Sequence, residues 1–514
     1  MFDVILFTDM TNSRIPIKAA GAYKIAQSLR SAGYKVKVIN NLFWTLQNDY
    51  DGLMDLMHKI VSSQTKVIGF STTFLSAIDD NDSNPLVDNS KKFGKRLFGA
   101  LDYDKVSTES SYRIKPEMLR FLRNLNESFN ETKLIMGGES TAAQIMWKLC
   151  DDIEYWIRGM ADASILKFMR EIDTIPPGIW AYDTKAVTHD FRNDSVTYIP
   201  EDAVLENEPL TLELSRGCRF KCKFCSYPML GRSPKDETYL KSESAILREL
   251  AHNRDNFGTE IYTMLCDTFN ESTDKLLTVQ RAIQQAKVDI RFFSYLRIDL
   301  IHKFPDQINI LRDMGVAGAH FGIESLNHES AKAIGKGLHT DKVLDTLEAC
   351  KRSWGTDTII HSGFIVGLPY DTQESVSDWV GMLERNETPL TSWALTALYM
   401  QSADRTDPHV YSSTFDSEAD KWGYDRSSGQ WKNDHWSYAS AFDYVADVQS
   451  RSIGWNERTP TPHTAISMLG LDFTWQEVYN ANRNFSQLKP DLLARAEERR
   501  QDYWQIVNLT DRNN

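Results

Sequence analysis

Short apolar runs alternate with helical stretches along most of the chain, and this alternation limits the possible folds more than any other feature. In the N-terminal third, five such runs are separated by segments with apolar residues at helical spacing. This order favours a parallel sheet covered by helices on both faces. We therefore predict an α/β fold that begins with a doubly wound sheet, with strands at residues 2–8, 35–39, 66–71, 133–136 and 153–157.

A second group of six strand-like runs follows, again separated by helical stretches. This periodicity is that of a partial, six-unit (β/α) barrel, in which functional residues gather at the carboxyl ends of the strands. The six predicted barrel strands are residues 211–214, 261–265, 291–296, 318–322, 358–366 and 393–399.

Changes in composition suggest where the domains begin and end. A long polar excursion interrupts the first sheet, and Pro176-Pro177-Gly178 breaks the chain after it. The last segment is rich in Trp and Tyr, and we expect it to form a small, mostly helical cap that carries substrate determinants. The expected units are 1–172 with an insertion at 74–115, a linker at 173–209, the barrel at 210–403 and a C-terminal region at 404–514.

Three cysteines stand close together directly after the first barrel strand. Cys218, Cys222 and Cys225 have the spacing C-x3-C-x2-C, with no fourth Cys nearby. Three thiolates can hold three irons of a cubane cluster and leave the fourth iron open, whereas an electron-transfer cluster is normally closed by a fourth thiolate. Zinc is the alternative, although zinc takes four ligands at short spacing and the nearest downstream His is His252.

With Phe224 before the last cysteine, this loop resembles the CxxxCx(aromatic)C signature of the radical S-adenosylmethionine (radical SAM) superfamily. The resemblance implies a [4Fe-4S] cluster on Cys218, Cys222 and Cys225, whose open iron binds S-adenosylmethionine (SAM). It also implies that the reduced cluster cleaves SAM to a 5′-deoxyadenosyl radical, with an electron donor such as flavodoxin or ferredoxin.

The ends of the other barrel strands resemble the same family. Examples are Gly322-Ile323-Glu324-Ser325 after the fourth strand and Gly367-Leu368-Pro369 after the fifth. Cys266 stands where related chains carry an acidic residue, and we expect it to be a small buried apolar side chain. The resemblance implies SAM-binding roles for Phe224, Asp267, Arg297, Glu324, Ser325, Gly367 and Pro369.

The N-terminal sheet resembles the cobalamin (B12)-binding domain that precedes the barrel in one large radical SAM subfamily. The first strand is followed by Asp9-Met10-Thr11, without the Asp-x-His-x-x-Gly motif that supplies an imidazole to cobalt. Two interpretations stay open: a cobalamin site without a protein His, or a degenerate domain kept for packing. The residues implied for cobalamin are Ser71, Thr72, Gly137, Gly138 and Gly159.

The composition excludes some other classes of protein. A formal net charge of −13 argues against a large nucleic-acid interface, and no stretch approaches the length of an apolar membrane span. The N-terminus lacks the basic region of a secretory signal, so we expect a cytoplasmic location and no disulfide framework. The remaining cysteines, Cys150, Cys266 and Cys350, are scattered, which argues against an auxiliary cysteine-bound cluster and against a methylthiotransferase.

The predicted function is a radical SAM enzyme acting on a small-molecule or peptide substrate. With cobalamin, the resemblance implies a methyltransferase; without it, hydrogen abstraction that leads to rearrangement or oxidation. The non-catalytic alternative is an iron–sulfur or zinc binding protein that retains the fold.

Overall fold

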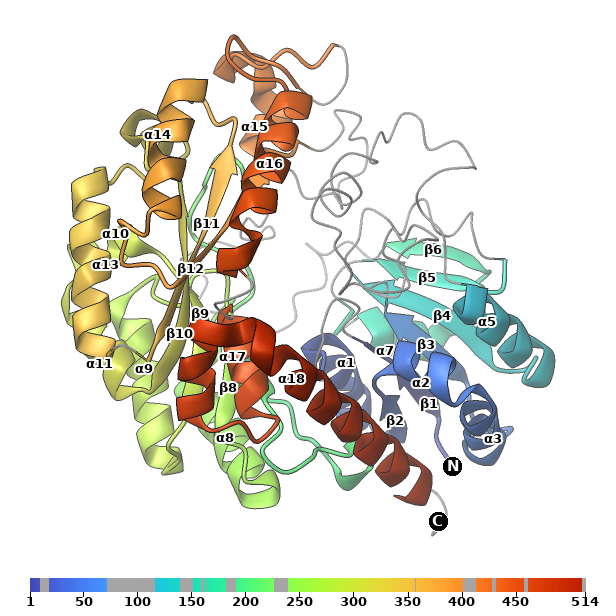
Figure 1. The fold of residues 1–514 in the computed structure, drawn as a ribbon. Helices are drawn as coiled ribbons and strands as arrows, with labels where there is room; N and C mark the ends of the chain where they lie inside the picture. Colours follow the sequence, from blue (N-terminus) through green and yellow to red (C-terminus); the bar gives the residue numbers. More distant parts are fainter. Residues whose placement is uncertain are drawn as a thin grey trace.

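Two six-stranded parallel sheets organise the chain in the computed structural model (Figure 1). The structure describes residues 1–9, 18–71, 116–138, 151–158, 161–162, 164–181, 191–225, 239–355, 357–400, 413–427, 431–456 and 461–510. The expected insertion at 74–115 lies outside these residues. Among the helices that are described, none is both long enough and apolar enough to cross a bilayer.

The first sheet has the strand order β2-β1-β3-β4-β5-β6, and every neighbouring pair is parallel. Because β1 lies between β2 and β3, the strand order reverses there, and ligands of open α/β sheets bind at such a point. The strands are β1 (Val4–Phe7), β2 (Val36–Ile39), β3 (Val67–Ser71), β4 (Lys133–Gly138), β5 (Tyr155–Arg158) and β6 (Gly178–Ala181).

Five of these strands match the prediction, and the sixth, β6, is an addition. It lies in the segment expected to be a linker, where the prolines at 176 and 177 suggest a chain break. β6 has only four residues and pairs with β5 at the edge of the sheet. Because no local apolar run marks this strand, its pairing depends on the tertiary fold.

Helices cover both faces of this first sheet, because alternate side chains of its strands point to opposite sides. Val4 and Leu6 pack with one group of helices, and Ile5 and Phe7 pack with another. The first face is covered by α1 (Ala20–Ser31) and α7 (Ser164–Glu171), and the second by α2 (Leu42–Asn48), α3 (Tyr50–Ile60) and α5 (Pro116–Ser128).

The second sheet has the order β12-β11-β10-β9-β8-β7, again entirely parallel, and forms the partial barrel that the sequence predicts. Its strands are β7 (Leu210–Glu213), β8 (Ile261–Leu265), β9 (Arg291–Leu296), β10 (Val316–Glu324), β11 (Ile359–Val366) and β12 (Ser392–Ala397). The connecting helices are α8 (Glu243–Phe257), α9 (Thr273–Ala286), α10 (Ile298–Lys303), α11 (Asp306–Asp313), α12 (His328–Ala333), α13 (Thr340–Trp354) and α14 (Gln373–Glu384).

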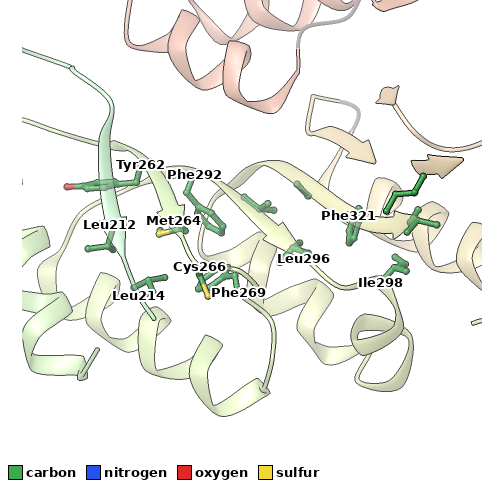
Figure 2. Close-up of a cluster of buried hydrophobic side chains, with 14 of the residues drawn as sticks. Leu212, Leu214, Tyr262, Met264, Cys266, Phe269, Phe292, Leu296, Ile298 and Phe321 are labelled. Carbon is green, nitrogen blue, oxygen red and sulfur yellow. The ribbon is translucent and has the colours of Figure 1, made fainter. Parts of the chain in front are cut away.

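The barrel core forms where one face of these strands packs against the connecting helices (Figure 2). Met264, Phe292 and Phe321 are fully buried in it, and Phe269 packs edge-on against Phe292 with ring centroids 5.6 Å apart. Each such side chain contributes about 1.5–3 kcal/mol of hydrophobic stabilisation. The strands are thereby held firmly, which keeps the positions of their carboxyl ends constant.

The C-terminal region is helical, as expected, but its last helix does more than cover the barrel. α18 packs at Leu492 and Ala496 beside α17, which lies against the barrel strands, and at Tyr503, Trp504 and Val507 in the core of the first sheet (Figure 1). It therefore braces the two halves of the molecule. The helical elements here are α15 (Thr414–Glu418), η6 (Ala419–Trp422), α16 (Tyr438–Asn456), α17 (Pro462–Leu469) and α18 (Trp475–Thr510).

Candidate active site

The cysteine loop begins at the carboxyl end of β7 and is held by backbone contacts. Gly217 adopts a left-handed backbone (φ +88°), which lets the chain turn sharply into Cys218. The N–H of Lys223 donates to the carbonyl of Ile334 at 3.2 Å, and the N–H of Phe415 donates to the carbonyl of Lys223 at 3.0 Å. The loop is thus fixed by the end of α12 on one side and by α15 on the other.

All three cysteines line one cavity of about 540 Å³ at the carboxyl ends of the barrel strands. Four of the predicted SAM-binding residues line it too, from four different places in the barrel. The complete lining is Cys218, Phe220, Cys222, Phe224, Cys225, Asp267, Thr268, Tyr295, Leu296, Arg297, His320, Gly322, Glu324 and Lys336.

Two cysteine sulfurs have hydrogen-bonding partners in this cavity. Arg297 Nη1 donates to Cys222 Sγ at 3.1 Å, and Thr268 Oγ1 lies 3.3 Å from Cys218 Sγ. Burial raises the pKa of the Cys218 thiol, and the contact with Thr268 opposes that shift. Hydrogen-bond donors around cysteine sulfurs are a typical environment of iron–sulfur clusters, because they stabilise the negative charge.

These residues fit a cubane cluster. Three sulfurs, a cationic donor and a hydroxyl surround a cavity with room for both a cluster and an organic ligand. Within the described part of the chain, no three His, Cys, Asp or Glu side chains gather closely enough to be ligands of a single metal ion.

Arg297 is positioned at the end of β9 by contacts on both its backbone and its side chain. Its N–H donates to Asn270 Oδ1 at 2.8 Å, and its guanidinium binds the carboxylate of Asp299 at 2.8 and 3.0 Å. The guanidinium also lies 4.2 Å from the centre of the Phe220 ring. Arg297 and Asp299, two positions apart in the sequence, thus form an ion pair that aims the arginine at the cysteine loop.

Glu324 ends β10 with a left-handed backbone (φ +70°) at a shift in the register of the strand pairing. Such a conformation is uncommon for a residue other than Gly and is often found at functional sites. Burial raises the pKa of Glu324, although Lys336, whose Nζ lies 3.9 Å from Oε1, acts in the opposite direction. A Cβ at Gly322 would lie 2.7 Å from Glu324 Oε1 and 3.1 Å from Lys336 Nζ, so a larger residue here would displace the ends of these two side chains.

Three predicted SAM-binding residues do not line the cavity. Ser325 is buried, and its Oγ accepts a hydrogen bond from the N–H of Asn327. Gly367 has φ +94° and the Trp431 ring packs where a Cβ would stand; Pro369 follows it and is buried. These residues shape the turns behind the cavity wall, and a direct role in SAM binding stays a prediction.

His320 is a lining residue that the sequence analysis missed. Its ring lies 4.9 Å from that of Tyr295 and 4.7 Å from that of His361, between centroids. Burial, together with His463 and Lys336, lowers the pKa of His320 to about 4, so that the ring is neutral at pH 7. The available signal was the two-residue period of β10, which puts His320 on the same face as Gly322 and Glu324.

Cys266 is buried within the hydrophobic core as expected, and polar groups also contact its sulfur. Lys275 Nζ lies 2.8 Å from Cys266 Sγ, and Ser215 Oγ lies 2.9 Å from it. The same Nζ donates to Glu271 Oε1 at 3.0 Å. Cys266 is therefore a buried core side chain, as predicted, that also has a polar partner, because the fold brings Lys275 from α9 to the end of β8.

A second cavity, of about 370 Å³, lies between the first sheet and the barrel. It contains the carboxyl ends of β1, β3 and β4, including the predicted Ser71 and Gly137. The role of Gly138 stays a prediction, and Thr72 and Gly159 lie outside the described residues. The lining comprises Leu6, Phe7, Thr8, Ala19, Ala20, Gly21, Ala22, Lys24, Ile25, Gly69, Phe70, Ser71, Ile135, Gly137, Ile157, Ala161, Asp162, Ile165, Glu213, Arg216 and Leu265.

The lining of this second cavity is mostly apolar, with a few charged and hydroxyl side chains. Four consecutive small residues, Ala19, Ala20, Gly21 and Ala22, line the cavity, and Leu and Ile side chains line it as well. None of the described residues that line it is a His, so they offer no imidazole to a cobalt ion. The residues are compatible with a corrin bound without a protein nitrogen ligand.

Comparison with known proteins gives the same family for the barrel. Residues 212–383 match the model of the radical SAM superfamily. An uncharacterized methyltransferase of Pyrococcus horikoshii is 24% identical over 186 residues, which is 36% of this chain and 39% of the relative. One of Synechocystis is 26% identical over 210 residues, 39% of this chain and 38% of the relative. The chain thus matches well under half the length of these curated relatives.

Solved structures extend the similarity of the fold to both sheets. The radical SAM methyltransferase TsrM from Kitasatospora setae, solved with tryptophan and a SAM analogue, has a TM-score of 0.61 at 11% identity, covering 95% of this chain and 99% of that one. The cobalamin-dependent radical enzyme OxsB has a TM-score of 0.50 at 14% identity, covering 80% of this chain and 54% of that one. Residues 212–383 thus match the radical SAM superfamily, and the chain shares with TsrM and OxsB the fold of a doubly wound sheet before the barrel.

Proposed function

We propose that this protein is a radical SAM enzyme that binds a [4Fe-4S] cluster on Cys218, Cys222 and Cys225 and cleaves SAM. One observation supports this most: the three thiols line a single cavity together with Arg297 and Glu324. When bound, the reduced cluster supplies the electron that cleaves SAM, and cobalamin supplies a carrier for a methyl group.

The described side chains have distinct roles in this proposal. Arg297 and Thr268 donate hydrogen bonds to the cysteine sulfurs, and the positive charge of Arg297 offsets the negative charge of the thiolates. Glu324, beside Lys336, accepts hydrogen bonds from the ammonium or the ribose hydroxyls of SAM. Phe220, Phe224 and Leu296 supply apolar walls that keep water from the reacting groups.

We further propose that the reaction is a cobalamin-dependent methyl transfer. Three observations support it: the second cavity at the strand-order reversal of the first sheet, the methyltransferase names of both curated relatives, and the fold shared with TsrM and OxsB. The methyl acceptor is a small molecule or a peptide, and the electron comes from a donor such as flavodoxin or ferredoxin.

The test begins with anaerobic purification after growth with added iron and hydroxocobalamin, followed by metal analysis and a visible spectrum. The proposal expects about four irons and one cobalt per chain. Reduced enzyme incubated with SAM should then release 5′-deoxyadenosine or S-adenosylhomocysteine, and Cys222→Ala should abolish both.

Each outcome selects one interpretation. Iron without cobalt, with SAM still cleaved, would favour a cobalamin-independent enzyme that abstracts hydrogen. Intact SAM in the presence of a full, reducible cluster would contradict the enzymatic proposal and favour a non-catalytic iron–sulfur protein.

A further inference from the structure

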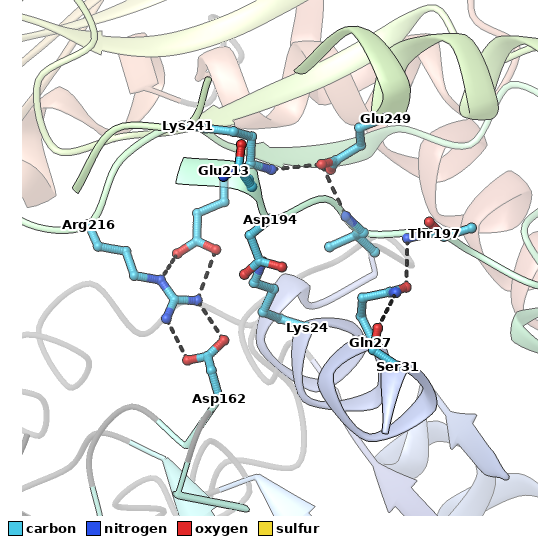
Figure 3. A network of polar contacts seen from close by, with 12 residues as sticks. Lys24, Gln27, Ser31, Asp162, Asp194, Thr197, Glu213, Arg216, Lys241 and Glu249 are labelled. Carbon is cyan, nitrogen blue, oxygen red and sulfur yellow. Dashed lines mark hydrogen bonds and ion pairs between the residues drawn. The ribbon is translucent and has the colours of Figure 1, made fainter. Parts of the chain in front are cut away.

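Arg216 is held between two carboxylates that come from the two halves of the molecule (Figure 3). Its Nη1 and Nη2 bind the carboxylate of Asp162, which follows β5 of the first sheet, at 2.5 and 3.0 Å. Its Nε and Nη2 bind Glu213 at the end of β7, at 2.7 and 3.1 Å. The guanidinium is thus bidentate to both partners, the strongest geometry of an arginine–carboxylate contact.

The same residue lies between the two cavities. Its side chain, with those of Asp162 and Glu213, lines the cavity at the first sheet. Its backbone N–H donates to the carbonyl of Tyr239 at 3.0 Å, and the chain then turns at Gly217 into Cys218. Arg216, in the wall of the first-sheet cavity, is therefore only two residues before Cys218, the first cysteine of the other cavity.

Burial makes this link costly to break. Arg216 and Asp162 are 8% and 4% exposed, and removing one partner of a buried ion pair is strongly destabilising because the other charge stays behind unpaired. Displacing Asp162 by a small movement of its loop would incur part of that cost. Through these contacts Arg216 connects the wall of the first-sheet cavity to the start of the cysteine loop.

The surrounding charges are arranged so that Asp162 and Glu213 bind Arg216 rather than a neighbouring cation. Arg216, Lys24 and Lys241 all lie about the buried ring of Phe191, at 5.0, 5.3 and 5.6 Å from its centroid. Lys24 pairs with Asp194, and Lys241 with Glu249 at 2.7 Å. Each cation in this network has its own acidic partner, which defines one position for the guanidinium.

We propose that Arg216 is a positioning residue that couples the two cofactor sites: a corrin in the first-sheet cavity and a cluster on the cysteine loop each stabilise the other through the Asp162–Arg216–Glu213 contact. This inference rests on the proposed function, because it takes cobalamin and the cluster as the occupants. Thermodynamic linkage makes the coupling reciprocal, so the two ligands change each other's affinity by the same factor.

The test measures binding rather than turnover. Hydroxocobalamin is titrated anaerobically into the full-length protein with and without its reconstituted cluster, and the free ligand is measured by equilibrium dialysis. Couplings of this kind are typically about 5–150-fold, and we expect binding about tenfold tighter to the cluster-loaded wild type. Asp162→Asn is an isosteric change that removes the charge. In this variant, the ratio of the hydroxocobalamin affinities with and without the cluster should fall below about twofold.

A second measurement reads the coupling in the other direction. Iron release to a chelator should slow about tenfold when hydroxocobalamin is present in the wild type, but not in Asp162→Asn. Arg216→Lys keeps the positive charge but cannot make the bidentate contacts of the guanidinium, so this variant should also lose the coupling. It replaces Asp162→Asn in the test if Asp162→Asn does not fold. Thermal unfolding checks the folding of each variant.

Asp202→Asn is the matched control. Asp202 is fully buried and bidentate to Arg30 at 2.7 and 2.8 Å, but it contacts neither cavity. The Asp202→Asn variant should be less stable than the wild type but should keep the tenfold ratio of hydroxocobalamin affinities with and without the cluster. Equal affinity of wild type with and without cluster, or an unchanged ratio in Asp162→Asn, overturns the coupling alone. Absence of any hydroxocobalamin binding to wild type overturns both the coupling and the cobalamin part of the proposed function.

Discussion

Arg297 and Cys222 lie 75 positions apart in the sequence, and the fold brings the guanidinium Nη1 within 3.1 Å of the cysteine Sγ. The opposite side of the same guanidinium is bound by Asp299, so its orientation toward the sulfur is fixed. A cationic donor stabilises a sulfur most when its negative charge is greatest. The contact therefore favours the reduced form of a cluster bound at Cys222.

Arg297→Gln should lower the reduction potential of the reconstituted cluster. A hydrogen bond to a charged group contributes about 1.5–3 kcal/mol, and 59 mV corresponds to about 1.4 kcal/mol for one electron, so we expect a decrease of about 60 mV or more. A redox titration followed by electron paramagnetic resonance measures it. Arg291→Gln, at the exposed start of the same strand, should leave the potential unchanged. An unaltered potential in Arg297→Gln with a full cluster would show that the contact does not tune the cluster.

Glu324→Gln should weaken SAM binding without changing the iron content. A charge-assisted hydrogen bond contributes about 1.5–3 kcal/mol, so the Kd should rise about tenfold or more. Because burial raises the pKa of Glu324, wild-type affinity should fall as the pH decreases through a value above the ordinary 4.5, and the variant should lack this dependence. Equilibrium dialysis with labelled SAM tests both expectations.

Glu329→Gln is the control for this measurement, since Glu329 is exposed on the neighbouring α12. The same loss of affinity in both variants would argue against a specific role of Glu324.

The stability of the folded protein should fall as the pH rises from about 4 to about 7, because of the titration of Asp371. Burial raises the pKa of this carboxyl to about 7, although contacts from Ser330 and the N–H groups of Leu368 and Gly367 oppose the shift. The folded state then keeps a proton that the unfolded state loses near its ordinary pKa of 3.8, so stability falls with pH over this window. At 1.36 kcal/mol per unit, the loss reaches up to about 4 kcal/mol above pH 7.

Denaturant unfolding at several pH values measures whether the free energy of unfolding falls as the pH rises. Asp371→Asn should flatten the profile between pH 4 and 7, because an amide does not titrate and can still hydrogen-bond Ser330. Asp378→Asn, at an exposed position of α14, should reproduce the wild-type slope. A wild-type slope that Asp371→Asn leaves intact would assign the pH dependence to other groups.

Trp504→Ala should destabilise the protein by about 3–5 kcal/mol, the usual cost of truncating a buried Trp. Trp504 is 5% exposed in the core of the first sheet, and its Nε1 donates to Asp49 Oδ2 at 2.7 Å. Because α18 braces both halves, the loss should appear in the unfolding of the whole chain, followed by circular dichroism. Leu509→Ala, which alters a 54% exposed side chain of the same helix, should change stability by less than about 0.5 kcal/mol.

Particular elements show how far the sequence could predict this fold and site. β8 and β9 were predicted with the bounds that the structure has, because a buried strand is an apolar run that can be recognised locally. The grouping of Cys218, Cys222 and Cys225 in one loop after β7 was also visible in the sequence, since their spacing keeps the three thiols close together along the chain. β6 and the extent of α18 were missed, because each is stabilised by packing against segments far away in the chain.

The local pattern alone therefore determined the fold class, the order of the strands along the chain and the three thiols after β7, because each of these depends on neighbouring residues. Only the tertiary structure decided which side chains meet. His320 reaches the cavity from β10, Lys275 reaches Cys266 from α9, and Arg216 reaches Asp162 across 54 positions of sequence. The physical reason is that these contacts depend on register, strand order and the docking of two sheets, which no spacing within a single segment encodes.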